Sequence, residues 1–187
     1  MARPNEAGDG QKSHPEPTGI PDNGHTMRVS AKADYAVRAA AELAASEESG
    51  PLKAERISDS QDIPIKFLES ILLELKHAGI VRSQRGPDGG YTLARPATDI
   101  SIADVIRAVD GPLANVRGDR PENVVYTGAA ERLTDIWIAV RASLRMVLES
   151  TSLADLRDGT LPERVVELAR DPKAWVSLGR IRGTTAG

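Results

Sequence analysis

Residues 85–96 read RGPDGGYTLARP, and this stretch decides the fold that the sequence predicts. It holds three glycines and two prolines around one tyrosine, and glycine and proline are the residues that most strongly mark turns. The segments IVRS (80–83) and YTLA (91–94) on either side are short strand candidates. The sequence therefore predicts a β-hairpin with this glycine-rich turn at its tip.

Two helices are expected in the first part of the chain. Residues 31–45 are rich in alanine and keep their apolar side chains at helical spacing. A shorter helix covers about residues 52–61, where Ser58 and Gln61 match a capping box. A helix that began at Ser58 would have hardly one turn before Pro64, so we place Ser58 inside the helix.

A third helix follows from Pro64, which suits a first helical turn, to Gly79, a natural C-terminal stop. Its apolar stripe comprises Leu68, Ile71, Leu72 and Leu75. Three helices followed by a β-hairpin form a winged helix-turn-helix, in which the last helix enters a major groove and the hairpin, or wing, reaches the neighbouring backbone or minor groove. The predicted fold is mainly α with a small β-hairpin.

The composition of the turn fits a wing. Gly86, Gly89 and Gly90 permit a sharp turn and a close approach of the backbone to phosphates. Arg82 and Arg85 place positive charge there, whereas the carboxylate of Asp88 would be repelled by phosphate. An ordinary hairpin turn without DNA contact is the alternative.

Two charged residues near the start of the third helix are candidates for reading bases. Glu69 can accept a hydrogen bond from cytosine, and Lys66 can meet guanine or phosphate. Lys32, Tyr35 and Arg38 on the first helix are expected to position the protein on phosphates. The alternative for Lys66 and Glu69 is a solvated ion pair, and we interpret His77 as a helix-end cation rather than a sensor.

The rest of the chain predicts further helices. Ser101 and Asp104 are spaced as a capping box for a helix that ends at Gly111. A loop over residues 112–128 precedes a long helix at about 129–150, and two short helices follow before a frayed end. The apolar stripe of the long helix is expected to hold two copies of the chain together, and it comprises Leu133, Ile136, Trp137, Val140 and Leu144.

Composition excludes several classes of protein. The chain has 187 residues, a formal net charge of -3 and no cysteine, so disulfides, thiolate metal sites and cysteine-ligated iron–sulfur clusters are ruled out. No stretch approaches the roughly 20 apolar residues that span a bilayer, which favours a cytoplasmic protein without membrane contact. Residues 1–26 are expected to be a flexible tail in which His14 and His25 are solvated, and no metal or cofactor is expected.

Three segments together resemble the Rrf2 family of bacterial transcription regulators. They are KADYAVRAAAELA, ISDSQDIPIKFLESILLELKHAGIVRSQRGPDGGYTLARP and ISIADVIRAVDG, within residues 27–111. The resemblance implies a homodimer with two winged heads, joined by the long helix and bound to an imperfect palindrome. By position it assigns base reading to Pro64, Lys66 and Glu69, and it matches Arg85 to the wing arginine and Tyr35 to a backbone-contacting tyrosine.

The chain departs from this family in its chemistry. Members that sense iron–sulfur status carry three cysteines before the long helix, and the matching region near Gly118, Val124 and Ala130 has none. The loop side chains that remain can line a pocket for a small polar ligand or dock another protein, and they are Arg117, Asp119, Arg120, Glu122 and Tyr126. An ion-paired structural loop is the alternative.

The sequence thus predicts a sequence-specific, dimeric DNA-binding regulator, which we expect to be a repressor. Its expected parts are the tail (1–26), the winged domain (27–111), the effector or partner loop (112–128) and a helical dimerisation region (129–187). A protein-interaction module on the same scaffold, without DNA binding, is the alternative. An enzyme is not expected, because no nucleophile is paired with a base and the segment GPDGG lacks the lysine and following helix of a phosphate-binding loop.

Overall fold

The structure is a computed structural model that describes residues 29–176. The predicted tail, with His14 and His25, lies outside the described residues, as do residues 177–187.

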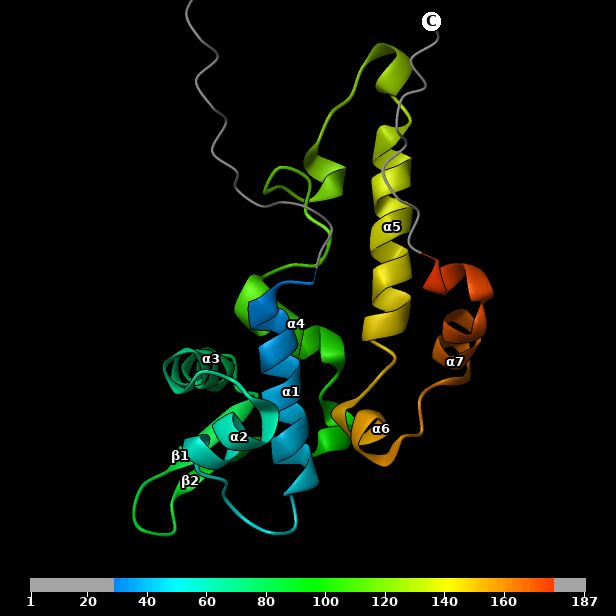
Figure 1. The fold of residues 1–187 in the computed structure, drawn as a ribbon. Helices are drawn as coiled ribbons and strands as arrows, with labels where there is room; N and C mark the ends of the chain where they lie inside the picture. Colours follow the sequence, from blue (N-terminus) through cyan, green and yellow to red (C-terminus); the bar gives the residue numbers. More distant parts are fainter. Residues whose placement is uncertain (1–28, 177–187) are drawn as a thin grey trace, which may run out of the picture.

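The described chain is mainly helical with one two-stranded antiparallel sheet (Figure 1). The predicted order of three helices, hairpin, helix, long helix and two short helices is confirmed. The helices are α1 (Ala31–Ala45), α2 (Ala54–Gln61), α3 (Ile65–His77), α4 (Ile102–Asp110), α5 (Leu133–Leu148), α6 (Leu153–Asp158) and α7 (Glu163–Arg170). The strands are β1 (Val81–Gln84) and β2 (Gly90–Leu93), and short 3-10 turns cover Ala97–Asp99, Pro121–Asn123, Gly128–Ala130 and Pro172–Trp175.

The helix ends follow local chemistry. The Ser30 hydroxyl accepts a hydrogen bond from the Ala33 amide and begins α1. Ser58 lies inside α2, as expected, and donates to the carbonyl of Ile63 at 2.6 Å. The predicted capping box of α4 forms between Ser101 and Asp104.

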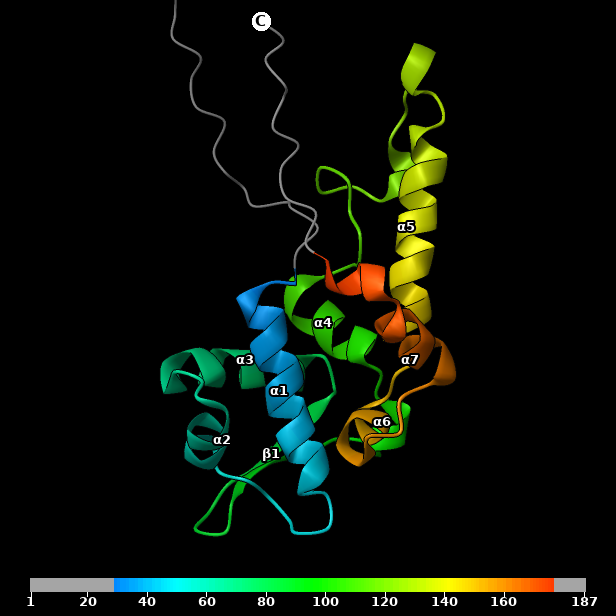
Figure 2. The same ribbon diagram turned by 45° about the vertical axis from the view of Figure 1, so that its right-hand side comes forward.

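We call the part of the molecule built from α1–α4 and the hairpin the head. Its core lies around α1, which occupies the middle of the molecule between α3 and α4 (Figures 1 and 2). The inward face of α1 is built mostly of small side chains, so its neighbours pack close to its backbone. The buried members of this face are Ala33, Ala36, Ala39, Ala40, Leu43 and Ala44. The predicted stripe of α3 is buried against them.

The hairpin is attached to the head through a third backbone segment. Its register pairs Val81 with Leu93 and Gln84 with Gly90. Leu52 then adds a bridge on the far side of β2: its amide donates to the Tyr91 carbonyl at 2.9 Å, and its carbonyl accepts from the Tyr91 amide at 2.7 Å. This bridge fixes the base of the wing on the segment before α2.

Beyond α4 the chain extends away from the head and then returns. None of the residues of α5 is buried in the described structure, and the helix projects from the head (Figure 1). The chain comes back where the Ile102 amide donates to the Thr151 carbonyl and the Leu153 amide donates to the Ile100 carbonyl, each at 2.9 Å. Leu153 is fully buried in the core of the head, which therefore includes the first turn of α6.

The predicted long helix began too early. We expected it at about residue 129, but a 3-10 turn occupies Gly128–Ala130 and α5 begins at Leu133. Within residues 29–176, the helices are all too short or too polar to cross a membrane.

Candidate nucleic-acid interface

The outer face of α3 is exposed and polar at its N-terminal end. The Lys66 side chain is 89% exposed, and its ammonium lies 3.1 Å from a carboxylate oxygen of Glu69, whose side chain is 47% exposed. An ion pair that is this exposed contributes little to the stability of the fold. Either side chain can therefore leave the pair to contact a base or a phosphate at little cost in free energy. Two apolar side chains of α3 that the sequence argument did not single out, Phe67 and Leu73, are also exposed.

Three of the predicted contact residues gather where α1 meets the start of α3. The ring of Tyr35 packs edge-on against Phe67, with ring centroids 5.7 Å apart. The guanidinium of Arg38 lies 5.4 Å from the centre of the Tyr35 ring, and its Nε donates to Gln61 at 3.0 Å. Pro64 is exposed beside them, at the residue before α3.

Lys32 occupies a different environment. Its ammonium lies 2.7 Å from a carboxylate oxygen of Glu74 and donates to the Val109 carbonyl at 2.8 Å. This side chain therefore joins α1 to α3 and to the end of α4. Its contact with phosphate stays a prediction, and a structural role is already visible.

The wing separates its glycines into two groups. Arg85 and Gly86 are exposed at the tip, whereas Gly89 is buried. A Cβ atom on Gly89 would overlap the Gln84 carbonyl oxygen, and one on Gly90 would overlap the Leu52 carbonyl oxygen. Gly89 thus serves the turn of the hairpin itself, and Gly90 serves the packing of the hairpin against Leu52. Of the three glycines only Gly86 is exposed for a backbone approach.

Polar contacts fix the wing relative to α3. The Arg82 Nε donates to the hydroxyl of Thr92, its cross-strand partner, at 2.9 Å. Lys76, in the last turn of α3, donates to the hydroxyl of Ser83 on β1 at 2.8 Å. Sequence reasoning missed this second contact, because nothing in the order of residues places Lys76 beside Ser83.

The loop before α5 packs against that helix. The Trp137 indole N–H donates to the Tyr126 hydroxyl at 3.2 Å, and the Arg117 guanidinium lies 5.9 Å from the Tyr126 ring centre. Glu122 forms an ion pair of 2.6 Å with Arg141. Hydrogen bonding to its own backbone, and then to Arg141, lowers the pKa of Glu122. Asp119 and Arg120 are exposed in the same loop.

This packing divides the predicted dimerisation stripe. Trp137 is half-buried against the loop, whereas Ile136 is 54% exposed on the helix. Leu133, Val140 and Leu144 are half-buried. A second row of side chains, at positions 136, 139, 143 and 146, is exposed along α5.

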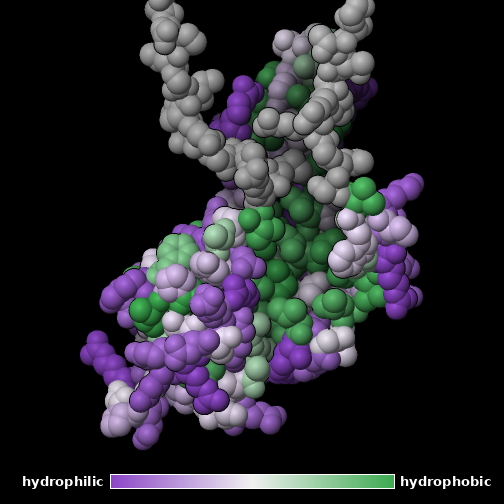
Figure 3. Space-filling view, in the orientation of Figure 1, coloured by the Kyte–Doolittle hydropathy of each residue, from purple (hydrophilic) through white to green (hydrophobic). Residues whose placement is uncertain are grey.

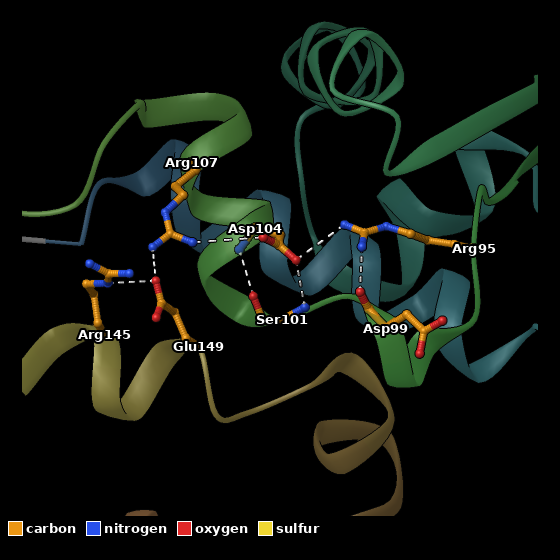
Figure 4. Close-up of polar contacts among 7 residues, drawn as sticks. All are labelled: Arg95, Asp99, Ser101, Asp104, Arg107, Arg145 and Glu149. Carbon is orange, nitrogen blue, oxygen red and sulfur yellow. Dashed lines mark hydrogen bonds and ion pairs between the residues drawn. The ribbon is translucent and has the colours of Figure 1, made fainter.

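A chain of charged side chains connects the end of the wing to α5 (Figure 4). Arg95, just after β2, lies 3.3 Å from Asp104, and Arg107 lies 3.9 Å from another oxygen of the same carboxylate. Arg107 also pairs with Glu149, which Arg145 contacts at 2.9 Å. Hydrogen bonding to Arg107, followed by that to Arg145, lowers the pKa of Glu149.

An exposed helix backed by two others, together with a hairpin wing attached to the same core, defines a winged helix-turn-helix transcription regulator. Comparison with known proteins agrees with this class. The chain belongs to the Rrf2 family, described as iron-dependent transcriptional regulators, whose family model matches residues 29–159.

Relatives support the same assignment. The chain is 51% identical over 151 residues to Rv1287 of Mycobacterium tuberculosis, which is assigned to the HTH-type transcriptional regulators, with 81% of this chain and 94% of the relative covered. It is 33% identical to the regulator IscR of Cereibacter sphaeroides, over 70% of this chain and 86% of that one. These relatives are transcription regulators and not enzymes.

Solved structures show the same fold. CymR, the global cysteine regulator of Bacillus subtilis, superposes with a TM-score of 0.62 at 30% identity, covering 72% of this chain and 98% of that one. IscR of T. potens superposes with a TM-score of 0.59 at 29% identity, covering 81% of this chain and 93% of that one. The chain has no cysteine, so it cannot hold an iron–sulfur cluster through thiolates, although the family description includes iron dependence.

Proposed function

We propose that this protein is a sequence-specific regulator that binds an imperfect palindrome as a homodimer and acts as a repressor. One observation carries the DNA-binding part of the proposal. α3 and the wing tip lie on the side of the head away from α5 in both views (Figures 1 and 2), and Lys66 on α3 and Arg85 at the wing tip are both exposed. The family membership supports this reading over an interaction module without DNA binding.

Each side chain has a proposed role. Lys66 and Glu69 exchange their exposed ion pair for contacts with guanine or phosphate and with cytosine. Arg85 and the backbone of Gly86 approach the minor groove. Tyr35 and Arg38, on α1 beside the start of α3, position the head on phosphates.

The homodimer is proposed from the exposure of α5. A helix of 16 residues in which no residue is buried obtains little stability from its own head. Ile136 and Met146 are exposed along it, and Figure 3 presents apolar side chains gathered between α4, the lower end of α5 and α7. Burial of these faces by a second copy would stabilise the helix. Two heads joined in this way would read half-sites about 34–36 Å apart, or a multiple of that spacing.

The central experiment recovers the genomic fragments that the purified protein retains and maps the protected sequence. We expect one recurring imperfect palindrome, whose affinity falls steeply as salt rises because phosphate contacts release counterions. The control is a Lys66→Ala, Arg85→Ala double variant, which should retain no enriched sequence. Recovery of no specific fragment at low salt would reject the proposal.

We propose that the protein acts in the cytoplasm, where it binds DNA. We further propose that the loop over residues 112–128 receives the signal, as a small molecule or a protein. Its contacts with α5 through Tyr126 and Glu122 support this role, because a change in the loop reaches the helix directly.

A further inference from the structure

A small cavity lies between the end of α4, the following loop and α5. Its volume is about 290 Å³, and its polar lining consists of Arg107, Asn115, Arg120, Glu122, Arg141 and Arg145. The lining comes from three separate elements, since Arg107 belongs to α4, Arg120 to the loop, and Arg141 and Arg145 to α5.

The cavity carries an excess of positive charge. Four guanidinium groups line it against one carboxylate, that of Glu122. Glu149 stands beside the cavity, where it contacts both Arg107 and Arg145. Both carboxylates have a lowered pKa, which Glu122 owes first to its own backbone and Glu149 first to Arg107, so both stay ionised at neutral pH. Even with both counted, the cations outnumber the anions.

Two of the four arginines are partly withdrawn from water, whereas Arg145 is 53% exposed and Arg120 is exposed on the loop. The Arg141 side chain is only 22% exposed and that of Arg107 only 35%, so solvent and salt screen their charges less than those of the outer surface. A planar guanidinium presents a fork of donors that matches phosphate and carboxylate oxygens in pairs. Several such forks around a cavity of this size suit a small molecule with several anionic oxygens.

We propose that this cavity binds a small polyvalent anion, of the phosphate or polycarboxylate class. The proposal names a ligand class for the signal-receiving loop proposed above, and binding of the anion does not depend on contact with DNA. The anion takes the donors that Glu122 and Glu149 now occupy on Arg141, Arg107 and Arg145. Since Arg107 and Arg145 belong to different elements, an anion held by both joins α4 to α5.

The ion pairs beside the cavity also extend to Arg95, just after β2 at the base of the wing. Figure 4 shows Arg107 between Glu149 and Asp104, with Arg95 at the end of the wing on the other side of Asp104. An anion that draws Arg107 away from these carboxylates alters the contacts of Asp104 with the segment after β2. Occupancy of the cavity is therefore expected to change the affinity of the protein for its operator, a consequence that rests on the proposed function.

Binding is tested by calorimetry on the full chain, with inorganic pyrophosphate and citrate as separate probes at fixed ionic strength. We expect saturable binding of at least one probe, with one site per chain. Arg141→Gln should weaken it at least tenfold, and Arg120→Gln, at an exposed loop position, should weaken it several-fold without disturbing the fold. Glu122→Gln should strengthen it several-fold, because it removes the competing carboxylate.

The control is Arg164→Gln, which removes an arginine from an exposed ion pair on α7. Its affinity for the probe should match that of the unchanged protein. Absence of saturable binding of both probes, or equal weakening by Arg120→Gln and Arg164→Gln, would overturn the proposal. If the protein binds the probe in this cavity but retains no DNA fragment, that result would reject the proposed function and would still support the anion site.

Discussion

Gly86 and Gly90 belong to the same hairpin, yet the structure constrains them differently. Gly86 has φ +112° and open space around it, whereas a Cβ atom on Gly90 would overlap the backbone of Leu52. Sequence reasoning gave both glycines the same role at the wing tip, because composition reveals a small residue but not the neighbour that demands it. That neighbour is Leu52, which is distant in sequence and lies beside Gly90 because it forms a β-bridge with Tyr91.

Gly90→Ala is therefore expected to destabilise the protein. The added methyl group must displace the Leu52 backbone, and overpacking of this kind costs about 1–3 kcal/mol. The measurement is the free energy of unfolding in urea. Gly118→Ala is the control, because its position has open space and only an unfavourable φ of +86°; a larger loss at Gly118 would contradict the packing argument.

Arg85→Ala is expected to weaken operator binding with little change in stability. Loss of a bidentate base contact costs about 1–3 kcal/mol, and the exposed side chain contributes little to the fold. Fluorescence anisotropy with a labelled operator at fixed salt measures the effect. Arg164→Ala, far from the wing on α7, is the matched control, and equal affinities of the two variants would remove Arg85 from the interface.

At the scale of elements, periodicity and capping predicted the helices well. The apolar stripe of α3 and the capping box of α4 are present as expected, because both depend on residues close together in sequence. The contacts of Lys32 with Glu74 and of Lys76 with Ser83 join separate elements, and no local pattern indicates them. The start of α5 was placed too early because the alanines at 129 and 130 favour a helix but lie in a 3-10 turn.

The second capping box, at the start of α6, gives a prediction with a pH dependence. Hydrogen bonding to the Ser152 hydroxyl, and then to the Ser152 backbone, lowers the pKa of Asp155. Because the folded-state pKa lies below the unfolded value, this carboxylate stabilises the fold above the unfolded pKa. That stabilisation is lost as the pH falls through the folded pKa.

Ser152→Ala is expected to raise the pKa of Asp155 towards its ordinary value and to cost about 0.5–2 kcal/mol at neutral pH. Titration of the side-chain carboxyl by NMR measures the first effect, and urea unfolding the second. In Ser150→Ala, which removes a hydroxyl bonded only to backbone carbonyls of α5, the pKa of Asp155 should not move. If the pKa of Asp155 is the same in Ser152→Ala as in the unchanged protein, the contact with the Ser152 hydroxyl is not the cause of the lowered pKa.

At the scale of the whole molecule, the exposed row on α5 predicts the oligomeric state. Ile136→Glu places a charge on that row and is expected to shift the mass in solution from two chains to one. Operator affinity should fall with it, since two joined heads bind more tightly than one. Light scattering coupled to size-exclusion chromatography measures the mass, and Val125→Glu, at an exposed apolar side chain off the helix, is the control. A single-chain mass for the unchanged protein would contradict the proposed dimer.

The return of α6 to the head has a consequence for any attempt to separate the parts of this molecule. The head is discontinuous in sequence, because Leu153 and Ala154 complete a core that is otherwise built before Gly111. A fragment that stops at residue 111 should therefore aggregate or melt at a lower temperature than the intact chain. A protease that cleaves the chain between α4 and α6 should instead leave the two fragments associated, and they should separate only when the core unfolds.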